Sequence, residues 1–330
     1  TQARMLSELA RSWIELGRVP EARKASDKAV SSARRAEGSG PNAVLRALDA
    51  QSAALTYGQD FSVAIEGFRT VVERSDALGE MMLATRARIN LGLALNRVGC
   101  FDQGKGVLER ALVDTRILRM RAGEGLAIHH LGRSLGRMRD FDQAIVLQQE
   151  ARRIGEETGH YRLMMLSRIY EAMLLQMRGQ GGDLECALLL IEATRGEAKL
   201  HPFCDLEANM VHAFILQKVG DLSAALERCS AAMASLATLG TMEEGEEALR
   251  MVQVELLLAL GKEDEASRAL RSAYDRVMSR CMKMSLKEHR DAYLSKLFEC
   301  RRIIDLASDR LSLTRPFALS IRPPSNSNDG

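Results

Sequence analysis

The sequence has few of the residues that build sheets and membrane spans. Aromatic residues make up 4% of its 330 positions, and no apolar run approaches the length of a transmembrane helix. The N-terminus lacks the uncharged apolar stretch of a signal peptide, because Arg4, Glu8 and Arg11 interrupt it. We therefore predict a helical chain that does not interact with membranes.

Paired cysteines and an excess of one charge are also missing. The six cysteines are widely spread with no C-x-x-C pair, which is typical of reduced thiols in a cytoplasmic protein. The 46 basic and 44 acidic residues nearly cancel, leaving a net charge of +2 and no general field that attracts nucleic acid. These absences predict a cytoplasmic protein that does not bind nucleic acid.

Catalytic and cofactor-binding motifs are absent from the sequence. No histidine belongs to an H-E-x-x-H motif, and there is no glycine-rich phosphate loop and no G-x-S-x-G motif. We expect no enzymatic activity, no bound metal and no cofactor.

The sequence does contain a repeat of about 40 residues. Seven copies of a short motif end in a small residue, at Ala22, Ala64, Gly104, Ala144, Ala187, Ala225 and Ala266. Apolar residues flank each motif at intervals of three and four, which places them on one face of a helix. Each unit is therefore predicted to be a helix–turn–helix hairpin that buries its apolar face against its neighbours.

The repeat predicts about fifteen to seventeen helices and no strand. Hairpin turns are expected at Gly17, Gly58 to Asp60, Gly99, Arg139, Gly179 to Gly182, Gly220 and Gly261. Small residues within the first helix of a unit, such as Gly92 and Gly132, are expected where that helix approaches its partner closely.

The motif resembles the tetratricopeptide repeat (TPR). The third unit matches best, with Leu91-Gly92 and Leu95 before the turn, Phe101 after it, and Leu108 in the second helix. The period exceeds the usual 34 residues, so helices longer than the family norm are expected.

The resemblance implies an all-α fold, a right-handed superhelical α-solenoid of about seven hairpins over residues 1–283. Residues 284–310 are expected to form a capping helix, because a repeat array needs a polar outer end. Residues 311–330 are rich in Pro, Ser and Asn and are expected to be a disordered or strap-like tail.

The C-terminal part is similar to the TPR regions of bacterial eukaryotic-type serine/threonine kinases and signal-transduction ATPases. The similarity rests on residues 239–250 and 290–307. It implies that the chain, which starts inside a helical pattern, is the sensor or scaffold part of a larger bacterial signalling protein.

In a stack of such hairpins the first helices line a concave groove. The polar residues expected to face its middle and bind the partner are Arg86, Asn90, Asn96, Arg97, His129, His130, Arg133, Arg137, Arg168, Tyr170 and Gln176. Residues expected to give the groove an apolar end are Met210, Val211, Phe214, Met251 and Val252. A chance run of arginines on a solvated helix surface is the plainer explanation of the basic positions.

The middle set is basic and contains no carboxylate. It therefore suits a protein or peptide partner with an acidic segment or a free C-terminal carboxylate. Arg133 and Arg137 are expected to be solvated, and His130 is expected to lose its proton readily because the nearby arginines disfavour its cation.

Taken as a sequence, the chain is predicted to be a non-catalytic protein- or peptide-interaction module whose partner lies in the groove. The alternative is self-association. In that case the solenoid edges and the terminal helix form a homo-oligomer, or dock on an attached kinase or nucleotide-switch domain and keep it inactive.

Overall fold

The computed structural model describes residues 2–35 and 40–316 and shows an all-helical chain. Within these residues there are sixteen helices and no strand. The helices are α1 (Gln2–Glu15), α2 (Val19–Arg35), α3 (Pro41–Tyr57), α4 (Phe61–Ala77), α5 (Met81–Arg97), α6 (Phe101–Ile117), α7 (Arg121–Arg137), α8 (Phe141–Thr158), α9 (Tyr161–Arg178), α10 (Asp183–Ala198), α11 (Pro202–Val219), α12 (Leu222–Leu239), α13 (Glu246–Ala259), α14 (Glu263–Lys283), α15 (Lys287–Lys296) and α16 (Phe298–Leu311). No helix among them is long and apolar enough to cross a membrane.

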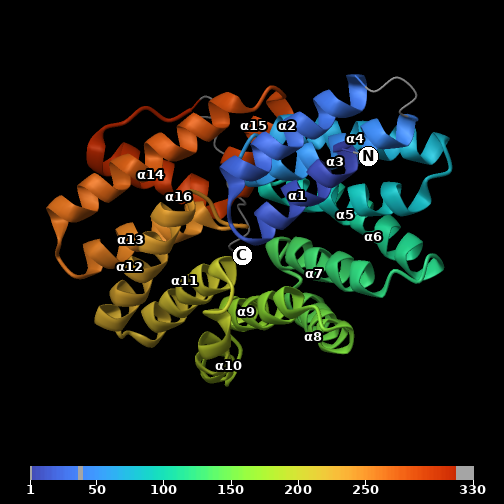
Figure 1. Ribbon diagram of the computed structural model, residues 1–330. Helices are drawn as coiled ribbons and strands as arrows, with labels where there is room; N and C mark the ends of the chain where they lie inside the picture. The colour runs from blue at the N-terminus through green and yellow to red at the C-terminus, as the bar shows by residue number, and fades with distance from the viewer. Residues whose placement is uncertain (1, 36–39, 317–330) are drawn as a thin grey trace, which may run out of the picture.

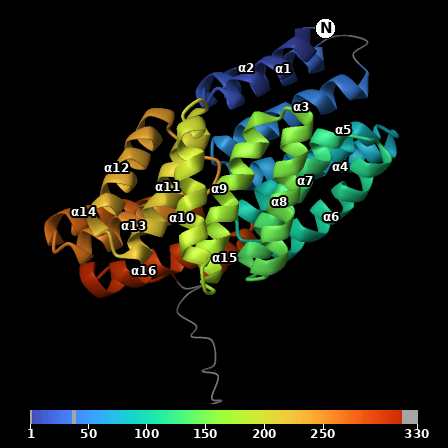
Figure 2. The ribbon, with the colours of Figure 1, turned by 90° about the horizontal axis from the view of Figure 1, so that it is seen from below.

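The first fourteen helices form seven antiparallel hairpins stacked side by side (Figure 2). Every predicted hairpin turn is present, and each contains a residue with positive φ: Gly17, Gln59, Gly99, Arg139, Gly179, Gly220 or Gly261. Gln59 and Arg139 adopt this left-handed conformation at a cost of about 1–2 kcal/mol each, whereas glycine adopts it freely. The repeat prediction and the predicted number of helices are confirmed.

The close approach predicted at two glycines is also confirmed. A Cβ atom on Gly92 would lie 2.4 Å from Cγ of Leu108 on the second helix of the same hairpin. A Cβ atom on Gly132 would lie 2.6 Å from Nε2 of Gln148 and 3.2 Å from the carbonyl oxygen of Ala144. Any side chain at these positions would force the contacting groups of the second helix to shift.

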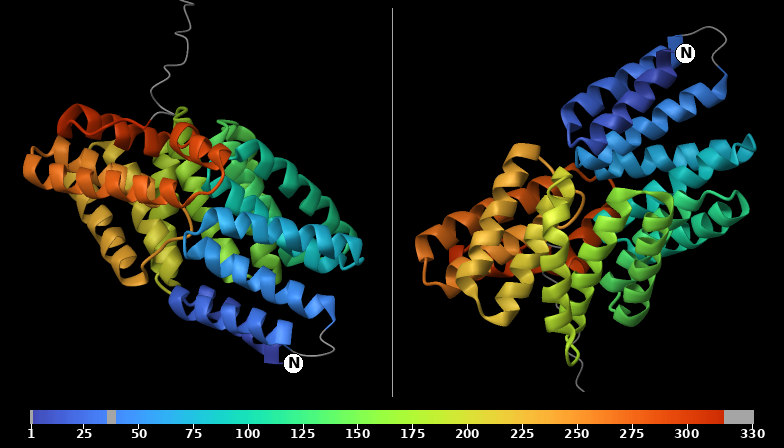
Figure 3. Two further views of the ribbon diagram at one scale, coloured as in Figure 1. Left: turned by 90° about the horizontal axis from the view of Figure 1, so that it is seen from above. Right: turned by 60° about the horizontal axis from the view of Figure 1, so that its bottom comes forward.

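The two ends of the solenoid meet. α15 contacts the second and third hairpins, where Ser62 lies 3.3 Å from Nδ1 of His289 and a Cβ on Gly99 would lie 2.8 Å from the carbonyl oxygen of Ala292. On another side, Phe203 of α11 packs on Tyr57 of α3, with ring centroids 5.7 Å apart. Figures 1 and 3 show the C-terminal helices returning beside the N-terminal hairpins. The C-terminal part of the chain therefore covers part of the concave side.

The segment predicted to be one capping helix contains two. α15 and α16 are separated at Leu297, which is buried and has extended backbone angles. The break allows α15 to pack on the N-terminal hairpins while α16 packs on α13 and α14. Of the predicted tail, residues 317–330 lie outside the described part of the chain.

Candidate functional site

An interior cavity of about 220 Å³ lies on the concave side. Its walls are mainly the first helices of the first five hairpins, α1, α3, α5, α7 and α9. The polar residues that line it are Arg11, Glu15, Thr56, Tyr57, Arg86, Asn90, His129, His130, His160, Arg162 and Glu243. Glu243 comes from much further along the chain than the others, in the connection between α12 and α13.

This connection carries an unusual run of carboxylates into the interior. We call residues 241–247, with the sequence TMEEGEE, the acidic segment; it ends in the first turn of α13. Its four glutamates are all buried, with Glu243 3% and Glu244 5% exposed. The side chain of Met242 and the preceding Thr241 are buried with them, and Thr241 donates to the carbonyl oxygen of Tyr57 at 2.8 Å.

In the described part of the chain, seven arginines form hydrogen bonds or ion pairs with the acidic segment. Five of them, which lie on four helices, we call the basic cluster: Arg97 on α5, Arg133 and Arg137 on α7, Arg162 on α9 and Arg280 on α14. The other two, Arg250 and Arg276, pair with Glu246. Arg133 donates to Glu243 at 3.3 Å and forms an ion pair with Glu244. Its guanidinium also lies 4.4 Å from the ring centroid of Tyr170, so both its edge and its face are occupied.

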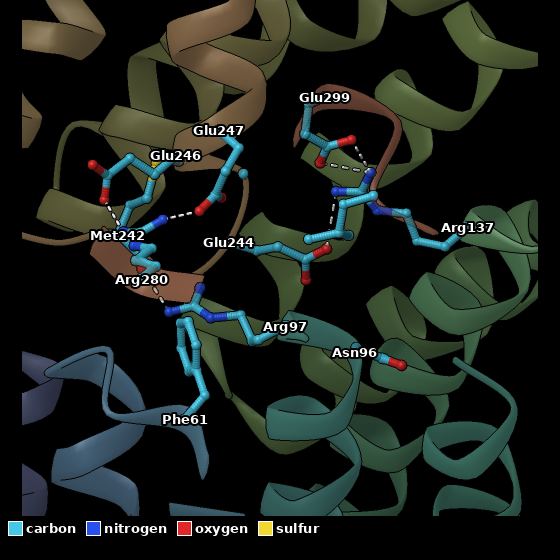
Figure 4. A pocket seen from close by; sticks show the side chains of 12 residues that line it. Phe61, Asn96, Arg97, Arg137, Met242, Glu244, Glu246, Glu247, Arg280 and Glu299 are labelled. Carbon is cyan, nitrogen blue, oxygen red and sulfur yellow. Dashed lines mark hydrogen bonds and ion pairs between the residues drawn. The ribbon is translucent and has the colours of Figure 1, made fainter. Parts of the chain in front are cut away.

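The other members of the cluster hold the rest of the segment (Figure 4). Arg137 lies between two carboxylates and donates to Glu299 at 3.0 Å and to Glu244 at 3.3 Å. Arg280 forms ion pairs with both Glu246 and Glu247. Each carboxylate is therefore compensated by at least one cation, as buried charges require.

Arg162 completes the cluster on the side of the cavity. It forms an ion pair with Glu243 and donates to Glu15 at 2.8 Å and to the hydroxyl of Tyr57 at 2.7 Å. Burial disfavours its charge, but Glu243 and Tyr57 raise the pKa of Arg162 well above its ordinary value. It therefore stays a cation.

Burial and these charges fix the protonation of the neighbouring groups. Burial opposes ionisation of Glu243, but Arg162 and Arg133 outweigh it and hold the pKa of Glu243 below its ordinary value. Glu207, which is buried nearby with no hydrogen-bond partner for its carboxyl, shows the reverse. Burial first, and the charge of Glu243 second, raise the pKa of Glu207. One carboxyl of this pair is ionised and the other holds a proton.

The two adjacent histidines are neutral. Burial lowers the pKa of His129 to about 3, with Arg133 as the next cause. Burial also lowers the pKa of His130 well below its ordinary value, with the neighbouring His129 and then Arg133 as the next causes. The pKa of His130 is shifted in the predicted direction, but burial, and not the arginines, is the main cause. Nδ1 of His129 lies 2.7 Å from Oε1 of Gln148, so the ring donates there and its Nε2 is left without a partner.

His129, His130 and Glu243 place three ligand atoms within 4.8 Å of one another. Two imidazoles and a carboxylate resemble a metal-binding set in composition. Both Arg133 and Arg162 already hold the Glu243 carboxylate, however, and their charges oppose the approach of a divalent cation. The chemistry of the group is therefore that of an ion-pair cluster.

The structure brings most of the predicted groove residues together. Arg86, Asn90, His129 and His130 line the interior cavity. Asn96, Arg97 and Arg137 line a second cavity of about 20 Å³ next to it, and Arg133 reaches the acidic segment between the two. Tyr170 lies beneath Arg133, edge-on to His129 with ring centroids 5.4 Å apart.

Two predicted positions lie elsewhere. Arg168 pairs with Glu156 of α8 and Glu197 of α10, so it faces the second helices and the outer side of the solenoid. Gln176 is half-buried and lines neither cavity. Both residues lie on α9. The range of α9 positions predicted to face inward was too wide, because only about a third of the circumference of a helix can face inward.

Three expectations about the groove are wrong. Arg133 is buried at 2% exposure rather than solvated, because the acidic segment covers it. The middle of the groove is not basic, because the acidic segment and Glu299 bring carboxylates to the arginines of the predicted set, which itself contains none. The expected apolar end is largely core, since Met210, Val211 and Val252 are buried in the apolar cluster of α9 to α13.

Within the acidic segment and the basic cluster, the residues that the sequence did not identify as part of the site are the carboxylates, Arg162 and Arg280. Glu243, Glu244 and Glu246 lie in the stretch 239–250, which carries the resemblance to signalling proteins but does not indicate where these side chains lie in the fold. Arg162 and Arg280 had no distinguishing signal.

No protein-family model matches this sequence, and no curated protein is significantly similar to it. Solved structures do match the fold. A Rap protein complexed with Competence and Sporulation Factor is 12% identical, with a TM-score of 0.63 over 94% of this chain and 87% of that one. NprR in complex with its cognate peptide NprX is also 12% identical, with a TM-score of 0.62 over 94% and 85% of the chains.

A third structure, the Rap conjugation gene regulator of the plasmid pLS20 in complex with the Phr* peptide, is 11% identical, with a TM-score of 0.59 over 97% and 98% of the chains. The fold is thus a TPR-like α-solenoid. At these identities the likeness concerns the fold alone.

Proposed function

We propose that the chain is a non-catalytic interaction module that binds a peptide or an extended segment of a partner protein on the concave side of its solenoid. The observation that carries this proposal is the interior cavity lined by the first helices of five successive hairpins. Several polar groups there have free hydrogen-bonding capacity, among them Nε2 of His129 and Nδ1 of His130. An extended backbone, with a donor and an acceptor at each residue, is the ligand that such a row of groups suits.

The solved structures with similar folds support the proposal, because three of them contain a bound peptide or signalling factor by name. The role of sensor or scaffold in a larger bacterial signalling protein of the cytoplasm is part of the same proposal. It is supported by the resemblance of residues 239–250 and 290–307 to such proteins and by six cysteines that are all free thiols.

Self-association has less support. The terminal helices α15 and α16, which were expected to offer the oligomer edge, are packed against hairpins of the same chain. A monomeric mass in sedimentation equilibrium is therefore the expected result.

The test is selection of linear peptides from a displayed library on the immobilised chain, followed by fluorescence anisotropy with the enriched peptides. Asn90→Phe places a ring in the cavity and should abolish binding. The control is Val146→Phe, which adds a ring on the exposed outer side of α8 and should bind as the wild type does. Peptides that bind both variants equally would contradict the concave site.

A further inference from the structure

The acidic segment differs from the other connections between hairpins. Residues 78–80 and 118–120, which join earlier hairpins, are exposed or half-buried at the rim of the solenoid. Residues 241–245 are all buried. The segment therefore occupies space on the concave side that the corresponding connections leave free.

Its backbone contributes little to the regular structure. Within the described residues, no backbone N–H from Thr241 to Glu244 donates to another backbone group. The segment is held by the ion pairs of its glutamates and by hydrogen bonds from side chains. Thr241 donates to the carbonyl oxygen of Tyr57, and Arg97 donates to that of Met242. Gln59 and Tyr293 donate to the carboxylates of Glu246 and Glu247.

Residues 241–244 could leave without breaking a helical backbone hydrogen bond, whereas Glu246 and Glu247 belong to α13 and the carbonyl oxygen of Gly245 accepts from Leu249. For residues 241–244 the cost falls mainly on ion pairs, which another acidic chain can compensate.

The fit of the segment to the basic cluster is incomplete. Arg97 is 8% exposed, and in the described part of the chain no carboxylate pairs with it. Its Nη2 donates to the carbonyl oxygen of Met242 at 3.0 Å, while its Nε has no acceptor. Beside it lies the cavity of about 20 Å³, which has room for about one water molecule. A buried guanidinium without a carboxylate is a binding site that is only partly used.

The segment also borders the cavity of about 220 Å³. Glu243 pairs with Arg133 and Arg162 and forms part of that cavity's wall. A chain that replaced the segment on the cluster would continue directly into the open space lined by Asn90 and His130.

We propose that the acidic segment is an internal ligand of the basic cluster, and that a separate peptide with neighbouring carboxylates replaces it when the chain binds its partner. This inference rests on the proposed function and gives it a ligand class. While the acidic segment occupies the basic cluster, a peptide cannot bind there. The apparent affinity for the peptide is therefore the intrinsic affinity multiplied by the fraction of molecules in which the cluster is free.

The probe is a fluorescent peptide with the chain's own sequence TMEEGEE, titrated into the whole chain. The double variant Glu243→Gln and Glu244→Gln removes two internal carboxylates and should bind the probe about tenfold or more tightly than the wild type does. Added salt should weaken that binding, because the attraction is between charges. The peptide TMQQGQQ should not bind.

A matched variant, Glu263→Gln and Glu265→Gln, removes two exposed carboxylates of α14 and should bind the probe as weakly as the wild type. If the first variant is folded by circular dichroism and binds the probe no better than the control variant, the inference is wrong. The proposed function would still stand if library peptides bind the wild type and are blocked by Asn90→Phe.

The Glu243→Gln and Glu244→Gln changes also destabilise the fold, because they leave arginines without a partner. A second measurement therefore uses the wild type. Excess TMEEGEE should increase backbone amide hydrogen exchange in residues 241–245 while α12 stays protected. Unchanged exchange in that segment at a peptide excess that saturates binding, or at the highest soluble excess, would overturn the replacement.

Discussion

Arg133 and Glu243 lie 110 residues apart in the sequence, yet their side chains meet in the interior at 3.3 Å. Arg133 points inward from the first helix of the fourth hairpin, and Glu243 enters from the connection ahead of the seventh. The contact exists because the solenoid curves until its C-terminal hairpins face its middle ones. The sequence predicted a solvated basic groove here, but the structure has a buried network of paired charges instead.

The first prediction concerns this network. Arg133→Ala should lower the thermal midpoint strongly and destabilise the fold by about 3–5 kcal/mol, because it leaves Glu243 and Glu244 buried with less compensation. Arg153→Ala removes an arginine whose side chain is 59% exposed and should change stability by less than about 0.5 kcal/mol. Equal thermal midpoints for the two variants would show that the network does not stabilise the fold.

The second prediction concerns the packing within a hairpin. Gly92→Ala should destabilise the protein by about 1–3 kcal/mol, since its Cβ would lie 2.4 Å from the buried Cγ of Leu108. Gly106→Ala is the same chemical change at a helical glycine with no atom within 4 Å of the added Cβ, so it should be neutral or stabilising. Chemical denaturation of both variants checks the difference, and a stable Gly92→Ala protein would argue against close packing there.

The third prediction is a pH dependence from His129. The pKa of His129 is lowered to about 3 in the folded state. Near pH 6.5, His129 therefore becomes protonated in the unfolded chain but stays neutral in the folded chain. Its contribution to stability is thus present above pH 6.5 and is lost as the pH falls toward 3. Relative to the wild type, His129→Gln should gain stability as the pH falls, by at most about 1.4 kcal/mol per pH unit. Thermal midpoints measured from pH 7 to pH 5 should show the gap; parallel curves would contradict it.

The fourth prediction has the opposite sign. Burial and Glu243 raise the pKa of Glu207 to about 8, so the folded chain holds a proton that the unfolded chain releases near pH 4.5. This contribution is fully present below pH 4.5 and is lost as the pH rises through the raised value. The Glu207→Gln side chain cannot ionise, so the stability of this variant relative to the wild type should increase as the pH rises from 6.5 to 8.5. A gap that stays constant over this range would mean that Glu207 does not titrate there.

The local structure of this protein was predictable from the sequence. A helical period on either side of a short turn motif places each hairpin, and the small residues Gly92 and Gly132 mark where its two helices touch. These features depend on interactions between residues that are close in the sequence, and the same interactions recur in every copy of the repeat. The inward direction of Asn90, His130 and Arg133 followed from the same period.

Only the tertiary structure decided what those inward residues meet. A small rotation between successive hairpins, accumulated over seven units, determines whether the ends of the solenoid stay apart or close, and no single repeat encodes that sum. Here they close, so α15 reaches Ser62 and the acidic segment reaches Arg133. Nothing in the sequence places the glutamates at 243–247 in the interior. They are buried because, once the ring closes, the arginines of four helices compensate their charge more favourably than separate burial of either sign would allow.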